Sequence, residues 1–334
     1  MDDTTAHTSP SHRERWREEI AAAVRDPDIL WTRLRLPRLL LPAGRRAAEA
    51  FPLLAPEPLL RRIRPGDPDD PILRQILPLG AELEAEPGFT ADPLQEAAQC
   101  AGTGLLHKYA GRSLIVATGA CAVHCRYCFR RHFPYAGEAG WRSALEQLPG
   151  DAEEVILSGG DPLTLDDEAL EEFFARAADH PSVQRLRMHT RMPVAVPSRV
   201  TERLLEAIAA SRLPVVVVVH ANHPAEIDDE TERALNALES AARAVLNQSV
   251  LLRGVNDDAD CLAALSRRLF DAGCLPYYLH LLDPVDGAAH FQIDDTEARR
   301  IAAETAARLP GYMVPRLVRE HPGASAKTVI TPRL

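Results

Sequence analysis

The chain has 334 residues, of which 46% are hydrophobic and 26% are charged, and it carries a formal net charge of −10. A chain of this size and composition can bury a substantial core, and its acidic balance argues against direct binding of nucleic acid. No apolar run approaches the roughly 20 residues of a membrane span, and the first residues lack the apolar core of a signal peptide. We therefore expect a cytoplasmic protein whose six cysteines are reduced thiols or metal ligands.

The first part of the chain is predicted to be helical. Helical spacing predicts a helix over 13–25 and a second one in the DPDILWTRLRL segment, 26–36. A proline-rich stretch at 53–78 is typical of short helices joined by extended connections. We predict an N-terminal helical region at 1–110 and recognise no chemistry in it.

After Arg112, short β-rich runs alternate with helical segments. This alternation predicts parallel strands joined by crossover helices, and the unbroken apolar run at 215–219 is typical of a strand buried on both faces. An open doubly wound sheet and a partial barrel both fit the pattern. The six predicted strands are SLIVAT (113–118), EVILSGG (154–160), RLRMHT (185–190), PVVVVVH (214–220), VLNQSVLLRG (245–254) and LPYYLHLL (275–282).

Polar residues follow each of these strands. In either α/β architecture, function gathers at the carboxyl ends of parallel strands, so we expect these side chains to share one site. They are the cysteines from Cys121, Ser158 to Asp161, Thr190 and Arg191, His220 to His223, Arg253 and Asn256, and Asp283.

The strongest local motif is TGACAVHCRYCFRRHF, in which Cys121, Cys125 and Cys128 follow the first strand with the spacing C-x3-C-x2-C. Three thiolates within eight residues can converge on one soft metal centre. A structural zinc site normally has four ligands, and His124 or His132 could supply the fourth. A four-iron cluster on three cysteines would instead leave one iron open to a small molecule. Both interpretations stay open on spacing alone.

With an aromatic residue, Tyr127, before the third cysteine, this motif resembles that of the radical S-adenosylmethionine (SAM) superfamily. More narrowly, the chain from about 112 to 327 is similar to lysine 2,3-aminomutases in CAVHCRYCFRRHF, ILSGGDPL, HTRMPVAVPSRVT, HANHPAEI, NQSVLLRGVND and the PG-x3-K ending. The resemblance implies an α/β fold, a partial (β/α)6 TIM-like barrel at 111–285, followed by a short segment at 286–334 that carries a catalytic lysine. It also implies a [4Fe-4S] cluster on the three cysteines, with SAM on the open iron.

The resemblance gives roles to further residues. It places the methionine amino group of SAM against Gly159, Gly160 and Asp161, and pyridoxal 5′-phosphate (PLP) on Lys327 as a Schiff base. Lys327 follows the small-residue loop PGASA, and the only other lysine of the chain is Lys108. Further cofactor contacts by the same match are Arg112, Asn247 and Gln248.

The substrate implied is free L-lysine. By the resemblance, Arg130 takes its α-carboxylate through the guanidinium fork, while Asp283 and Glu320 take its ε-ammonium. Glu320 stands where we expect an aspartate. The implied reaction moves the amino group from C2 to C3 after SAM cleavage, which requires an electron donor of flavodoxin or ferredoxin type.

The shortness of the chain after Lys327 and its helical opening resemble the branch that makes (R)-β-lysine for elongation factor P, which implies a functional link to that factor and its lysyl ligase. Two alternatives stay open. One is a metabolic aminomutase acting on lysine or another amino acid, and the other is a zinc or iron–sulfur binding module without catalysis. A homo-oligomer also stays open.

Overall fold

The computed structural model describes residues 12–100, 104–135 and 140–333. Within these ranges nine strands form one sheet in the order of the chain, β1 to β9. Strands β2 to β8 are parallel, while β1 and β9 pair antiparallel at its two ends. The strands are β1 (Leu105–Tyr109), β2 (Arg112–Thr118), β3 (Glu154–Gly159), β4 (Arg185–Thr190), β5 (Val215–Val219), β6 (Ala244–Val250), β7 (Leu275–His280), β8 (Arg316–Arg319) and β9 (Thr328–Val329).

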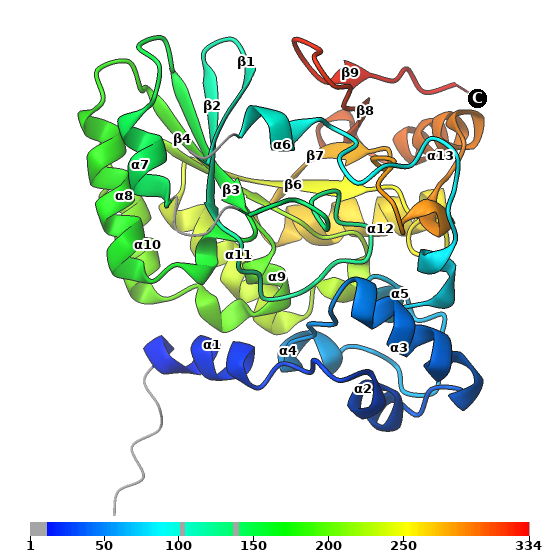
Figure 1. The fold of residues 1–334 in the computed structure, drawn as a ribbon. Helices are drawn as coiled ribbons and strands as arrows, with labels where there is room; N and C mark the ends of the chain where they lie inside the picture. Colours follow the sequence, from blue (N-terminus) through cyan, green and yellow to red (C-terminus); the bar gives the residue numbers. More distant parts are fainter. Residues whose placement is uncertain (1–11, 101–103, 136–139, 334) are drawn as a thin grey trace, which may run out of the picture.

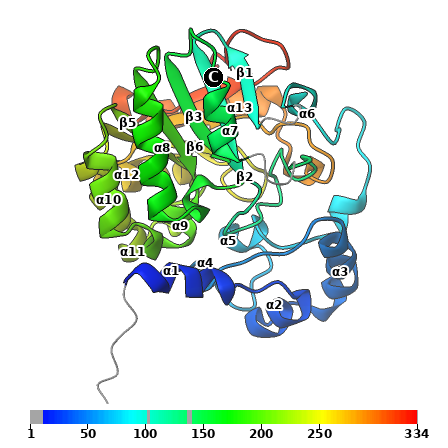
Figure 2. The same ribbon diagram turned by 60° about the vertical axis from the view of Figure 1, so that its left-hand side comes forward.

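Helices follow most strands and cover the outer face of the curved sheet (Figures 1 and 2). The helices from β2 onward are α7 (Trp141–Glu146), α8 (Asp167–Asp179), α9 (Met192–Ala195), α10 (Glu202–Ala209), α11 (Asp229–Ala241), α12 (Ala259–Asp271) and α13 (Asp295–Ala307). Five of them have an N-cap residue whose side chain accepts a backbone N–H of the first turn, and these caps are Asp166, Thr201, Asp228, Asp258 and Asp294.

The predicted α/β partial barrel is confirmed, and all six predicted strands are present as β2 to β7. The sheet is not closed, because in the described residues β9 pairs with β8 and not with β1. Three strands, β1, β8 and β9, were not predicted from the sequence. They extend the sheet by one strand before and two strands after the predicted six.

The N-terminal helices form a separate layer at one end of the barrel (blue in Figures 1 and 2). None of the helices in the described residues is long and apolar enough to span a membrane. The layer packs on the loops that follow the strands, as the contacts of Gln75 and Glu82 below show. Its helices are α1 (His12–Ala21), α2 (Pro27–Leu34), α3 (Leu41–Ala50), α4 (Glu57–Leu60) and α5 (Pro71–Arg74). A further short helix, α6 (Glu96–Gln99), lies apart from this layer and next to β1 (Figure 1).

Glu82 joins this layer to the cysteine loop. Its carboxylate accepts bonds from Arg126 at 2.6 and 2.9 Å and from Arg131 at 2.8 Å. All three side chains are at most 2% exposed. Removing one partner of a buried ion pair is costly because the remaining charges stay desolvated.

We therefore expect Glu82→Ala to lower the free energy of unfolding by about 3–5 kcal/mol, measured by urea denaturation of the full chain. Glu172→Ala removes a solvent-exposed carboxylate that pairs with Arg142 and Arg176, and it should leave the urea midpoint unchanged. Equal midpoints for the two variants would show that the Glu82 cluster does not stabilise the fold.

Candidate active site

A pocket of about 760 Å³ opens at the carboxyl ends of the strands, within the range typical of ligand sites. It collects side chains from β2, β3, β4, β6 and β7 and from the loops that follow them. Twelve of the thirteen residues to which the resemblance gives a role line it: Arg112, Cys121, Cys125, Cys128, Arg130, Gly159, Gly160, Asp161, Gln248, Asp283, Glu320 and Lys327.

Asn247 is the exception. Its side chain is buried and bonded to both backbone groups of Ala221, at 2.8 and 3.1 Å, and to the Ser249 hydroxyl at 2.9 Å. These bonds join β6 to the end of β5. Because successive side chains of a strand point to opposite faces, it is the neighbouring Gln248 that faces the pocket.

The three cysteine thiols enter the pocket from the loop after β2. The N-terminal layer anchors this loop, because the backbone N–H groups of His124 and Arg126 donate to the carbonyls of Leu54 and Gln75. Burial raises the pKa of Cys121 and raises that of Cys128 to about 11. As thiolates, these side chains would therefore need a cationic centre to stabilise them. The donor set and its shared pocket fit an iron–sulfur cluster.

The histidines considered as zinc ligands have other partners. Nδ1 of His124 lies 2.9 Å from the Pro52 carbonyl oxygen, and Nε2 of His132 lies 3.2 Å from that of Asp286. In the described part of the chain, no three His, Cys, Asp or Glu side chains are arranged to hold a single metal ion.

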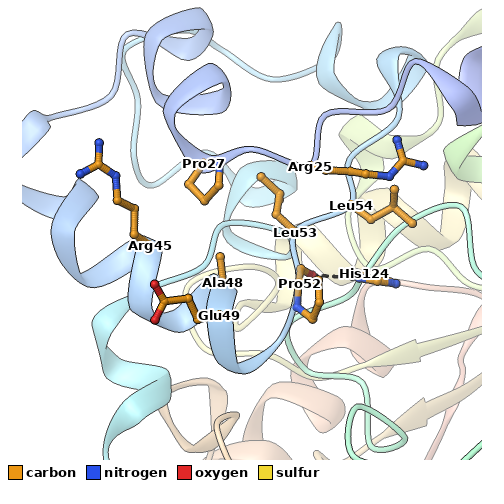
Figure 3. A pocket seen from close by; sticks show the side chains of 9 residues that line it. All are labelled: Arg25, Pro27, Arg45, Ala48, Glu49, Pro52, Leu53, Leu54 and His124. Carbon is orange, nitrogen blue, oxygen red and sulfur yellow. Dashed lines mark hydrogen bonds between the residues drawn. The ribbon is translucent and has the colours of Figure 1, made fainter.

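A smaller pocket of about 400 Å³ lies on the side of the N-terminal layer (Figure 3). The two pockets share Pro52 and His124 as lining residues. The smaller one has Arg25, Arg45 and Glu49 among its remaining residues.

Gly159 and Gly160 end β3 against the stretch that leads into the cysteine loop. Gly159 has a φ of +119°, which L side chains rarely adopt. The N–H groups of Gly160 and Asp161 donate to the carbonyls of Thr118 and Ala120, both at 2.7 Å. A Cβ on Gly160 would lie 2.2 Å from the Ala120 oxygen. The two glycines thus allow strand and loop to meet without side chains.

We expect Gly160→Ala to displace the cysteine loop and to weaken SAM binding about tenfold, since overpacking costs about 1–3 kcal/mol and 1.4 kcal/mol is a factor of ten. Equilibrium dialysis with labelled SAM measures the change in the dissociation constant. Gly150→Ala is the matched control, because nothing lies within 4 Å of a Cβ there. Equal SAM affinity in the two variants would contradict the close approach at Gly160.

The side chain of Asp161 has a structural task. It is buried and accepts bonds from the hydroxyl of Thr190 at 2.7 Å and from the backbone N–H groups of Arg191 and Met192 at 2.7 and 3.1 Å. It therefore fastens the end of β4 to the end of β3.

Arg130 is buried, and its guanidinium holds a carboxylate of the chain itself. Nε and Nη2 donate to Glu96 of α6 at 2.6 and 3.1 Å, and Nη1 lies 3.2 Å from the hydroxyl of Ser158. Glu96 is itself one of the pocket residues. The fork is thus shaped and placed for a carboxylate, and a substrate would share it with Glu96 or displace that side chain.

Lys327 enters the same pocket from the segment between β8 and β9 and forms an ion pair with Glu320. The two side chains are 22% and 11% exposed. A hydrogen bond joins Glu320 to Tyr109 of β1, and burial together with the carboxylate raises the pKa of that phenol. Tyr109 and Glu320 thus meet across the open side of the barrel. Arg112, Arg187 and Arg316 supply positive charge to the lining.

Two pocket residues, Glu96 and Tyr109, were not predicted from the sequence, because the first 110 residues were expected to carry no chemistry. Arg191 was expected at the shared site, but it was given no role. Tyr109 and Glu96 lie in short elements whose partners are distant in the chain, so no local spacing indicated them. For Arg191 the signal was its position directly after β4.

Comparison with known proteins gives consistent matches. A model of the radical SAM superfamily matches residues 115–261. The chain is 46% identical to an L-lysine 2,3-aminomutase of Escherichia coli over 95% of this chain and 94% of that protein. The L-lysine 2,3-aminomutase of Haemophilus influenzae is 44% identical over 95% of both chains. That of Clostridium subterminale is 35% identical over 82% of this chain and 67% of its own.

Proposed function

Since the chain belongs to the lysine 2,3-aminomutases of the radical SAM superfamily, we propose that it converts L-α-lysine to (R)-β-lysine with PLP held on Lys327. The enzyme is an isomerase, and its superfamily implies a [4Fe-4S] cluster and SAM. The observation that supports the proposal is that the three thiols and Lys327 line one pocket. Radical generation and amino-group migration can therefore act on one bound substrate.

We assign the cluster to Cys121, Cys125 and Cys128, and SAM to the backbone at Gly159, Gly160 and Asp161. When bound, the cluster and SAM would supply radical chemistry for hydrogen removal from the substrate, and PLP would supply an electron sink. The partial barrel around the pocket would limit the access of water to these groups. Arg130 would orient the substrate through its carboxylate, in exchange with Glu96.

Lys327 supplies the amine for PLP, and we assign Arg112 and Gln248 to the cofactor's phosphate and ring environment. Glu320 is a suitable partner for the ε-ammonium of lysine, because in this structure it already holds the ammonium of Lys327. Asp283, from the loop after β7, also lines the pocket. Together with Glu320 it would favour a cationic substrate over a neutral amino acid.

We further propose that the β-lysine serves the modification of elongation factor P through its lysyl ligase, and that a cellular flavodoxin- or ferredoxin-type donor supplies the electron. The resemblance in the DPDILW segment of the helical opening supports this branch.

The test is to resolve the enantiomers of the product from anaerobic reactions with L-lysine, and to offer that product to elongation factor P and its ligase. We expect (R)-β-lysine that the ligase transfers. An (S)-product, or a faster reaction with another amino acid, would favour the metabolic alternative.

A further inference from the structure

A buried polar cluster lies directly behind the cysteine loop. Its centre is Arg191, which follows β4 and is 7% exposed. It gathers Tyr127 from the cysteine motif, Gln75 from the N-terminal layer, and Glu226 with Asn222 from the loop after β5. Neither SAM nor substrate binding, as assigned above, gives these side chains a role.

Arg191 contacts a proposed cluster ligand directly. Its Nη1 lies 2.6 Å from Sγ of Cys125 and 2.6 Å from the hydroxyl oxygen of Tyr127. Its Nη2 donates to Oε1 of Gln75 and to Oε2 of Glu226, both at 2.8 Å. The guanidinium therefore has little freedom to turn away from the sulfur.

The surrounding residues fix this geometry further. The backbone N–H of Arg191 donates to Asp161 at 2.7 Å, and the Tyr127 hydroxyl is held by Asn222 at 2.7 Å and by Nε2 of His220 at 2.9 Å. Glu226 is buried and accepts the backbone N–H groups of Asn222 and His223 at 2.8 and 2.9 Å. Hydrogen bonds and charge around the sulfur ligands of a cluster set its reduction potential.

Reduction of a [4Fe-4S] cluster adds one electron from a one-electron donor and makes the cluster and its thiolates more negative. A cationic N–H donor on a ligand sulfur stabilises that reduced form more than the oxidised form, and low local polarity strengthens the effect. We propose that Arg191 is a positioning residue that raises the reduction potential of the cluster through its hydrogen bond to Cys125. This inference rests on the proposed function, which assigns the cluster to Cys125.

Glu226 reduces the effect of Arg191 on the reduction potential. Its carboxylate neutralises part of the Arg191 charge from the side away from the sulfur. Replacing it by glutamine keeps the shape and most acceptor sites but removes the negative charge. The two substitutions are therefore expected to shift the potential in opposite directions.

The experiment is an anaerobic redox titration of the cluster-loaded full chain at one pH, followed by electron paramagnetic resonance, with iron content measured for each variant. We expect Arg191→Met to shift the ratio of reduced to oxidised cluster at least tenfold toward the oxidised form, a fall of about 59 mV for one electron. Arg191→Lys should recover part of the loss, and Glu226→Gln should raise the potential.

An unchanged reduction potential in iron-replete Arg191→Met would overturn this inference but not the proposed function. Shifts of the same sign in Arg191→Met and Glu226→Gln would do the same. If Arg191→Met binds no iron, Glu226→Gln decides: a raised potential supports the inference and an unchanged one overturns it. A wild-type chain that takes up no iron–sulfur cluster would overturn the proposed function and this inference together.

Discussion

Lys327→Ala should lose all covalently attached PLP and all turnover while it keeps the iron of the cluster. Lys327 lies in the same pocket as the thiols, but it comes from the segment between β8 and β9, far along the chain from the cysteine loop. Removing its amine therefore takes away the attachment point without touching a cluster ligand. Only a lysine amine can provide this bond, so even Lys327→Arg should fail to restore it.

The attachment is measured by borohydride reduction of PLP-loaded protein followed by mass spectrometry of its peptides. Wild-type protein should carry the cofactor mass on the peptide with Lys327. Because the chain has one other lysine, Lys108→Ala is the natural control and should keep the label and the activity. A label that persists in Lys327→Ala would move the assignment to Lys108.

Cys125→Ala should lose most of the cluster iron and all cleavage of SAM. Three thiols can each bind one iron of a [4Fe-4S] cluster, and an alanine at one position leaves one of these irons without its cysteine ligand. Cys125 is also the thiol that Arg191 contacts. Its removal therefore leaves a buried guanidinium donor without its sulfur.

Iron and sulfide content after anaerobic reconstitution, together with the brown absorbance, measure this loss. Cys274→Ala is the matched control, because Cys274 is buried in the core beside the start of β7 and does not line the pocket. It should keep its iron. Full iron retention in Cys125→Ala would rule out the ligand assignment, and a colourless wild-type protein would favour the zinc-module alternative.

The central strands could be predicted from the sequence because each is a short β-rich run bounded by helix signals. Strand β5 is unbroken valine, and it is buried on both faces. Strand β9 has two residues and β8 has four, so neither carries enough pattern to predict. Strand β8 takes its place by pairing with β7, and β9 by pairing with β8, which only the folded chain shows.

The site was predictable where one motif carries its residues, as with the cysteine loop and the glycines after β3. It was not predictable where distant segments meet. Gln75 reaches Arg191 across 116 positions, and Glu96 reaches Arg130 across 34. Asn247 differs from both cases, since its motif was recognised but its side chain bonds Ala221 and does not line the pocket.

The most direct test of the central claim, that this pocket performs a lysine 2,3-aminomutase reaction, is anaerobic incubation with L-lysine, SAM, PLP and a strong one-electron reductant. Mass spectrometry then follows β-lysine. We predict β-lysine from the complete mixture, and none when SAM is omitted or when Lys327 is replaced by alanine. A complete mixture with an intact cluster that forms no β-lysine, or β-lysine formed without SAM, would contradict the account.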